Sequence, residues 1–223
     1  LIICTIFIYN QLNLLQNKKL GYEKEQILLI NKCDDIGMHL NAFKEDVKKL
    51  PGVINVTNTS MRFGEQIGNT VYESKIKDKK HSIIASVLLA DYNFIKTYNN
   101  KMKAGRFFEK TRITDTLGAM VINETTAKEL GYKKPVGDRI YQTALEGNGF
   151  EIIGVIDNFN FESLHLAIKP LVIRLYKPNQ FGRIVSVKIR GNNINRTVNE
   201  IKKIWSSYAG GQYFEYEFFD EYY

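Results

Sequence analysis

The sequence has 223 residues, which is enough for one large domain or two small lobes. With 44% hydrophobic and 12% aromatic residues, it holds enough apolar side chains to exclude disorder over most of its length. The net charge of +7 comes from 31 basic residues scattered among 24 acidic ones, without an arginine stripe or zinc-finger spacing. This pattern favours a solvated basic surface over nucleic-acid binding.

The N-terminal segment is apolar but short. The sequence begins with Leu1, and residues 1–9 carry no charge. This run is shorter than the ~20 residues that cross a bilayer, and it lacks the features of a signal peptide. We expect the chain to be part of a longer protein and residues 1–20 to be the outer end of a membrane helix. The alternative is a buried N-terminal helix or strand of a soluble domain.

The two cysteines give no sign of a metal site or a disulfide. Cys4 and Cys33 are outside any CxxC or other metal-ligand spacing, and Cys4 falls inside the apolar run. We therefore expect two unpaired thiols.

The first predicted unit is a strand, a helix and a strand. Residues 26–31 and 53–59 have strand patterns, and Asp34 or Asp35 is expected to cap the helix between them. The apolar residues of this helix recur at helical spacing and are Leu40, Phe43, Val47 and Leu50.

A region rich in short strands follows, with a short helical segment after Asp91. Asn123 is expected to cap a helix that ends at Gly131, and the polar residues 111–116 are predicted to form a loop. The strands are predicted at residues 71–76, 82–89, 119–122 and 139–143.

Residues 151–172 are expected to organise the chain, because they begin with a strongly apolar strand. β-Branched residues surround Gly154, and a glycine inside a strand indicates a bulge or close backbone approach. After this strand come Phe159 and Phe161, and then a second strand at residues 171–176.

The last part repeats the outline of the first. A strand at residues 184–189 precedes a helix that Asn192 or Asn193 is expected to cap, and a strand at 213–219 closes the chain. Strand–helix–strand units near both ends predict an α+β fold.

Short motifs follow one another from residue 19 to the C-terminus. They are Lys19-Leu20-Gly21-Tyr22, Leu50-Pro51-Gly52-Val53, Ala104-Gly105-Arg106-Phe107, Val121-Ile122-Asn123-Glu124, Leu130-Gly131, Pro135-Val136-Gly137, Ile153-Gly154-Val155, Asp157-Asn158-Phe159-Asn160-Phe161, Pro170-Leu171, and the Phe218 to Glu221 segment. In this order and spacing they resemble the extracytoplasmic domain of an ABC transporter permease of the MacB/FtsX type.

The resemblance implies a fold. In such permeases this domain is inserted between the first and second membrane helices, and two βαβ-like units form a porter-like lobe into which a second small α+β lobe is inserted. Residues 21–91 and 151–223 would form the porter-like lobe, and 92–150 the inserted lobe. Residues 1–20 would end the first membrane or stalk helix.

The resemblance also implies a function. The domain would couple cytoplasmic ATP hydrolysis to export or to activation of a periplasmic partner, without catalysis of its own. The partners would be a cytoplasmic ATPase, a second permease copy in a dimer and a periplasmic protein, and not nucleic acid. No cofactor is expected in this domain, because ATP would bind to the ATPase. The location would be the inner membrane, with this domain in the periplasm.

The residues alone give no catalytic motif. His39, His81 and His165 fall in different segments, and no P-loop, HExxH or GxSxG is present. His165 near Asp157 is the one acid–base candidate, but a packed or surface histidine is the preferred interpretation. Asp91 and Asp157 are read as turn or capping residues.

Phe159 and Phe161 are the candidate contacts with substrate or partner, although packing at the lobe junction is the preferred interpretation of both. The main functional alternative is the ligand-sensing domain of a membrane receptor, which predicts an enclosed pocket. A coupling domain predicts instead a groove between lobes, with residues 1–15 and Tyr223 at the same pole. A soluble enzyme with an unfamiliar site is a third, weaker alternative.

Overall fold

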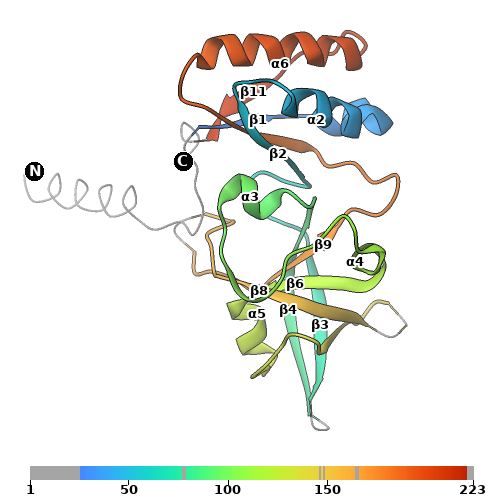
Figure 1. Cartoon of the computed structure of the whole chain (residues 1–223). Helices are drawn as coiled ribbons and strands as arrows, with labels where there is room; N and C mark the ends of the chain where they lie inside the picture. Colours follow the sequence, from blue (N-terminus) through green and yellow to red (C-terminus); the bar gives the residue numbers. More distant parts are fainter. Residues whose placement is uncertain (1–25, 77–78, 146, 148, 164–165, 220–223) are drawn as a thin grey trace, which may run out of the picture.

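The computed structural model describes residues 26–76, 79–145, 147, 149–163 and 166–219. Across these residues the strands pair into one mixed sheet of 11 strands. We call residues 27–59 and 184–218 the terminal unit, and residues 69–175 the middle unit. Figure 1 shows the terminal unit at the top and the middle unit below it. None of the helices described is both long and apolar enough to cross a membrane.

The terminal unit is an antiparallel sheet covered on one face by two helices, α2 and α6 (Figure 1). It confirms the predicted strand–helix–strand units near both ends of the chain and the α+β fold. Its elements are β1 (Ile27–Ile30), the short helix η1 (Cys33–His39), α2 (Leu40–Lys48), β2 (Val53–Thr59), β10 (Ile184–Ile189), α6 (Ile194–Tyr208) and β11 (Tyr216–Phe218).

Both faces of the terminal sheet are buried, which explains the unbroken apolar run of β1. Leu28 and Ile30 pack under α2 and α6, whereas Ile27 and Leu29 pack on the opposite side. Successive side chains of a strand point to opposite faces, so a strand covered on both faces buries every side chain and favours a continuous apolar run.

The middle unit is a sheet that closes on itself. β4 pairs with β3 and, in parallel, with β9, so the strands form a ring in the order β4-β3-β7-β8-β6-β9. The interior core of this ring includes Tyr72, Met120, Ile140 and Ile152. The strands are β3 (Asn69–Ile76), β4 (Lys79–Ala90), β5 (Met102–Gly105), β6 (Ala119–Asn123), β7 (Arg139–Gln142), β8 (Phe150–Ile156) and β9 (Leu171–Leu175).

Gly154 of β8 confirms the close approach predicted for a glycine inside this strand. A Cβ atom at Gly154 would lie 2.2 Å from the carbonyl oxygen of Arg106, because β5 and the residue after it pack directly on β8. The ladder between β6 and β8 also shifts register opposite this glycine, between Met120 and Val121. Any side chain here would push the two backbones apart.

An aromatic cluster joins the two units. It lies beneath the terminal sheet, where α3 (Phe94–Tyr98) contacts β2 and β10. The hydroxyl groups of Tyr98 and Ser186 are 2.6 Å apart, so α3 is also tied to β10 by a buried hydrogen bond. The buried aromatic residues of this junction cluster are Phe63, Phe94, Tyr98, Phe107, Phe108, Phe159, Phe161 and Phe219.

Of the three predicted helix caps, one is wrong, one is correct in position but makes no capping hydrogen bond, and one is confirmed. The helix after β1 begins as η1 behind Lys32, and neither Asp34 nor Asp35 caps it. Asn193 precedes α6 in a left-handed conformation, but its side chain makes no capping hydrogen bond. At α5 (Glu124–Glu129), in contrast, the Asn123 side chain accepts a hydrogen bond from the Thr126 N–H, as predicted.

The predicted loop at 111–116 is also wrong, since α4 (Ile113–Gly118) forms there. The segment is anchored by a residue that precedes it in the chain: both oxygens of Asp115 pair with the Arg106 guanidinium. A polar composition favours loops, but a buried ion pair organises this segment instead.

Several predictions stay open. Cys33 is a buried free thiol whose burial raises its pKa, whereas Cys4, residues 1–20 and Tyr223 lie outside the described residues. Strands of the predicted inserted lobe pair with strands beyond its boundaries at 91/92 and 150/151: β7 pairs with β3, and β6 pairs with β8. The boundaries themselves remain a prediction.

Candidate functional site

The candidate site is a groove at the junction of the two units. It begins with α2, whose apolar residues Phe43 and Val47 pack into the terminal unit. Lys44 and Lys48 are one helical turn apart and therefore share a face of α2, which borders the groove.

Asp91, directly after β4, organises the floor of the groove. One carboxylate oxygen pairs with the Lys44 ammonium group at 2.8 Å and accepts the Asn58 N–H at 3.0 Å. The other oxygen accepts the Thr57 hydroxyl at 2.6 Å and the Asn93 N–H at 3.0 Å. This carboxylate therefore links α2, β2 and the start of α3, and it confirms the prediction that Asp91 is a turn residue.

On the side of the groove formed by the segment after β9, a second polar side chain, that of Asn58, fixes the backbone. The Asn58 side chain donates hydrogen bonds to the Gly182 and Ile184 carbonyls and accepts one from the Gly182 N–H. Beside it, the buried Tyr176 hydroxyl has no hydrogen-bond partner among the described residues. Burial, reinforced by the carboxylates of Asp91 and Asp34, raises the pKa of Tyr176, so its hydroxyl stays protonated.

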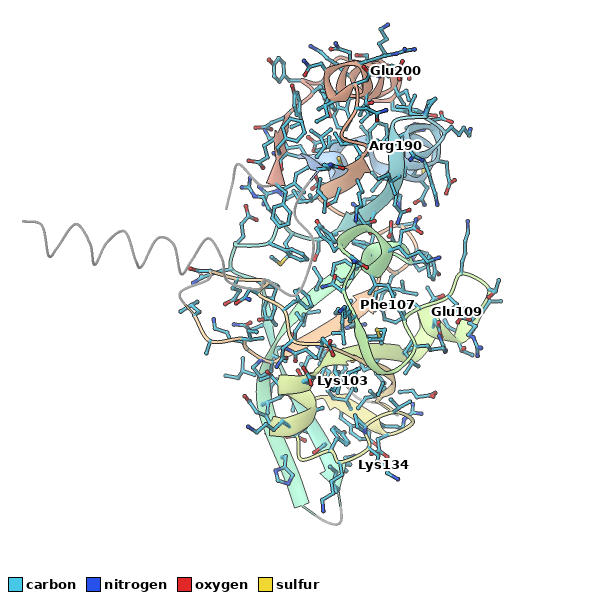
Figure 2. All side chains as sticks on the ribbon, turned by 60° about the vertical axis from the view of Figure 1, so that its left-hand side comes forward. Lys103, Phe107, Glu109, Lys134, Arg190 and Glu200 are labelled. Atoms are coloured by element: carbon cyan, nitrogen blue, oxygen red, sulfur yellow. The ribbon has the colours of Figure 1, made fainter. Side chains whose placement is uncertain are left out.

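The groove has a volume of about 1080 Å³ and opens between α2, α3, the segment after β5 and the segment after β9. Residues of α2, α3 and α4 line the groove, and Figure 1 shows α3 below α2 and α4 below α3. Figure 2 shows Phe107 and Glu109, two of its lining residues, near the middle of the molecule. The lining mixes apolar side chains, such as Tyr92, Ile95 and Phe181, with lysines.

Lysines, carboxylates, amides and apolar side chains make up most of the groove lining. Its described lining contains no histidine, cysteine or serine. Nowhere in the described part of the chain do three or more histidine, cysteine or carboxylate side chains come together as metal ligands.

The structure brings Phe159 and Phe161 into the junction cluster and not into the groove. Both side chains are buried, at 1% and 2% exposure, and their ring centroids are 5.8 Å apart. Phe159 also packs on Phe63 and Phe94. Their position agrees with the packing interpretation, while contact with a substrate or partner stays a prediction.

The other candidate residues that the structure describes, which are His39, His81 and Asp157, lie in different parts of the fold. His39 packs near the Tyr208 ring, whereas His81 is on β4 beside Gly131. His165 lies outside the described residues. Asp157 has a buried carboxylate oxygen with no partner among the residues described.

Sequence reasoning missed the groove because its residues come from four distant segments. Lys96, Lys110 and Lys177 carry no local motif, and each is an ordinary surface lysine in its own segment. The Lys44–Lys48 spacing on a predicted helix was the one usable signal. It indicated that the two lysines share a helix face, but not which segments of the chain lie opposite that face.

The fold is similar to those of several solved transporter domains. The periplasmic region of MacB from Actinobacillus actinomycetemcomitans matches with a TM-score of 0.65 at 14% identity, over 93% of this chain and 95% of that one. The extracellular domain of the noncanonic ABC-type transporter YknZ from Gram-positive bacteria matches with a TM-score of 0.56 at 16% identity, over 86% of this chain and 97% of that one. A domain of a protein assigned as a permease from Porphyromonas gingivalis matches with a TM-score of 0.57 at 16% identity, over 83% and 85%. No curated protein sequence matches significantly.

These likenesses define the fold as that of the extracytoplasmic domains of transporter permeases. The sequence gives the family: the model of the MacB-like periplasmic core domain matches residues 21–204. The chain therefore belongs to the MacB-like periplasmic core domain family, and it is a periplasmic domain of a MacB-like ABC transporter permease. This confirms the resemblance found in the sequence motifs.

Proposed function

We propose that this domain couples cytoplasmic ATP hydrolysis to export or to activation of a periplasmic partner, without catalysis of its own. The observation that carries the proposal is the pairing of β1 with β11. These strands are antiparallel neighbours, with Leu28 opposite Phe218, so the described chain enters and leaves the fold at one place. Such an arrangement suits a domain held between two membrane helices.

The mechanical path starts at these strands. Movement of the segments before β1 and after β11 would act on the same edge of the terminal sheet. The junction cluster and the Lys44–Asp91 pair connect this sheet to the middle unit. Because packed interiors are close to incompressible, the movement would reach the groove as a change in the angle between units.

The proposal includes partners that the domain alone does not contain. A separate ATPase domain or subunit would bind ATP, and a second permease copy would complete a dimer. A periplasmic protein is the third expected partner, and the location would be the inner membrane. Neither a cofactor nor nucleic acid has a place in this mechanism.

The test uses the complete transporter with its ATPase in lipid nanodiscs. Spin labels would replace exposed Lys203 on α6 and exposed Lys134 in the middle unit, and pulsed electron resonance would measure their separation. We expect a shift in the distance distribution on ATP binding, and no shift when the ATPase cannot bind ATP. ATP turnover with an unchanged distribution would contradict coupling through this domain.

The same spin-labelled samples distinguish the coupling function from the alternative, a ligand-sensing receptor domain. A ligand-sensing receptor domain would change the distance on ligand addition and not on ATP addition. The open groove at the junction gives this alternative no specific support, since a sensor is expected to enclose its ligand.

A further inference from the structure

The rim of the groove carries positive charge that the fold leaves unpaired. Lys48, Lys96, Lys110 and Lys177 come from four separate segments, are all exposed and line the groove. None of the four makes an ion pair with any described residue. Like charges gathered around one concave surface raise its potential and attract an anionic ligand.

The acidic groups nearby do not neutralise this rim. Asp91 is paired with Lys44, and Glu109 with Arg112 at 2.7 Å. Glu45 is the remaining carboxylate in the described lining. The groove therefore presents four lysines against one free carboxylate.

Apolar surface lies between these lysines. Tyr92, Ile95 and Phe181 line the groove and are only half-buried, while the rest of their surface packs on the cores of the two units. A simple anion would leave this surface exposed to water, whereas an amphipathic ligand would cover it.

Helix α4 extends the apolar surface beside the groove. Thr116 of α4 lines the groove, and Ile113 and Leu117 of the same helix are 77% and 79% exposed. The helix is fixed from beneath by Asp115, whose side chain is 1% exposed and paired with Arg106. A buried ion pair thus holds two large apolar side chains in water, which is unfavourable unless a partner covers them.

We propose that the groove binds an acidic amphipathic segment of a partner polypeptide. Its carboxylates would pair with the rim lysines, and its apolar side chains would cover Tyr92, Ile95, Phe181 and the exposed face of α4. The identity of the segment as the periplasmic partner's rests on the proposed function. A flat membrane surface fits less well, because it cannot reach the floor of a concave groove.

The probe is a short, fluorescently labelled peptide that alternates Glu and Leu, titrated against the 223-residue chain by fluorescence anisotropy. The double variant Lys96→Glu with Lys177→Glu is expected to weaken binding about tenfold or more. The matched control, Lys133→Glu with Lys134→Glu, changes the net charge equally. Figure 2 shows Lys134 below Phe107, and neither Lys133 nor Lys134 lines the groove. This control should change the affinity less than about twofold.

A second pair of variants tests how much the apolar contacts contribute to peptide binding. Leu117→Ser is expected to weaken binding severalfold, whereas Ile84→Ser, at a position 66% exposed on β4, should leave binding unchanged. A peptide with Ser in place of Leu should bind much more weakly than the probe. Circular dichroism verifies that each variant is folded, and Lys48→Gln with Lys110→Gln replaces the first pair if that variant unfolds.

Three results would overturn the inference. Equal losses in the groove and control variants would indicate diffuse surface charge. Equal binding of the Ser peptide would indicate a simple anion site. Groove-dependent binding to phosphatidylglycerol vesicles, with no binding of the peptide, would assign the groove to the membrane surface. Because no ATPase is present in these titrations, their outcome is independent of the coupling measured with spin labels.

Discussion

The terminal and middle units bury their apolar residues in different ways. The terminal unit keeps an open sheet and covers it with helices, so that Phe43 of α2 and Trp205 of α6 meet edge to face with ring centroids 5.5 Å apart. The middle unit curls its own sheet around a core, and β4 pairs with β9 to complete the ring. One design depends on helix packing, and the other depends on strand closure.

The groove lies at the junction of these two differently built units. The terminal unit supplies α2 to one wall, and the middle unit supplies α3, α4 and the segments after β5 and β9. We therefore expect substitutions at helix contacts to destabilise the terminal unit and substitutions at strand contacts to destabilise the middle unit. Either kind should also alter the groove, because the junction cluster connects the two units.

The largest expected effect is in the terminal unit. Trp205 is 1% exposed, and its indole N–H donates to the Gln212 carbonyl at 3.1 Å. Trp205→Ala should lower the free energy of unfolding by about 3–5 kcal/mol, because it leaves a large cavity and an unsatisfied carbonyl. Urea unfolding followed by far-ultraviolet circular dichroism measures this change, and Trp205→Phe should cost clearly less. A loss as small as that of a surface substitution would show that helix packing does not hold this unit.

The middle unit should be more sensitive to the distance between strands. Gly154→Ala places a methyl group 2.2 Å from the Arg106 carbonyl oxygen and 2.6 Å from the Met102 methyl group. We expect a loss of about 2–3 kcal/mol, since the backbone of β5 must move away. Gly68→Ala is the matched control, because its new methyl group meets no atom within 4 Å. Similar losses in both variants would remove close strand packing as the explanation.

The smallest expected effect is at α4 and depends on pH. Burial opposes ionisation of Asp115, but hydrogen bonds from the Arg106 guanidinium and the Glu109 N–H outweigh it and lower the pKa of this carboxyl. A lowered pKa stabilises the fold at pH values above the unfolded pKa of about 4, and this stabilisation is lost as the pH falls through the lower folded pKa.

Asp115→Asn should therefore cost about 1 kcal/mol at neutral pH, and the difference from the unsubstituted chain should vanish in acid. Thermal unfolding of both proteins between pH 7 and strongly acidic conditions measures it. Glu109→Gln is the control, because its partner Arg112 is exposed and the pair should contribute little. A difference that is independent of pH would mean that the Arg106–Asp115 charges do not stabilise α4.

The terminal unit was largely predictable because its signals are local. Leu40, Phe43 and Val47 on α2 recur at helical spacing, and these positions are buried as the pattern predicts. The continuous apolar run of β1 matches its burial at every position, and the alternating residues Val185, Val187 and Ile189 of β10 all belong to the core under the helices. Gly154 belongs to the same group, because a glycine inside an apolar strand indicates close packing whatever packs there.

The errors arose where contacts with residues outside a segment, or the local backbone conformation, replaced the expected local signal. α4 forms in a polar segment because Arg106 and a buried Asp115 hold it, and the sequence gives no measure of that burial. Asp34, Asp35 and Asn193 are good caps by residue type, but η1 already begins at Cys33, so that both aspartates lie inside its first turn, and Asn193 makes no capping hydrogen bond. The burial of Phe159 and Phe161 agrees with the packing interpretation of both residues, whereas the groove lysines had no motif to identify them.

The amino-acid sequence by itself determined the α+β class, most strands and helices, and the family, because side-chain periodicity and motif order are properties of neighbouring residues. Only the tertiary structure decided that the middle strands close into a ring, that β1 and β11 are neighbours, and that four lysines surround one groove. Those features depend on contacts between segments far apart in the chain. Such contacts are selected by the packing of the whole molecule and leave no periodic trace in any one segment.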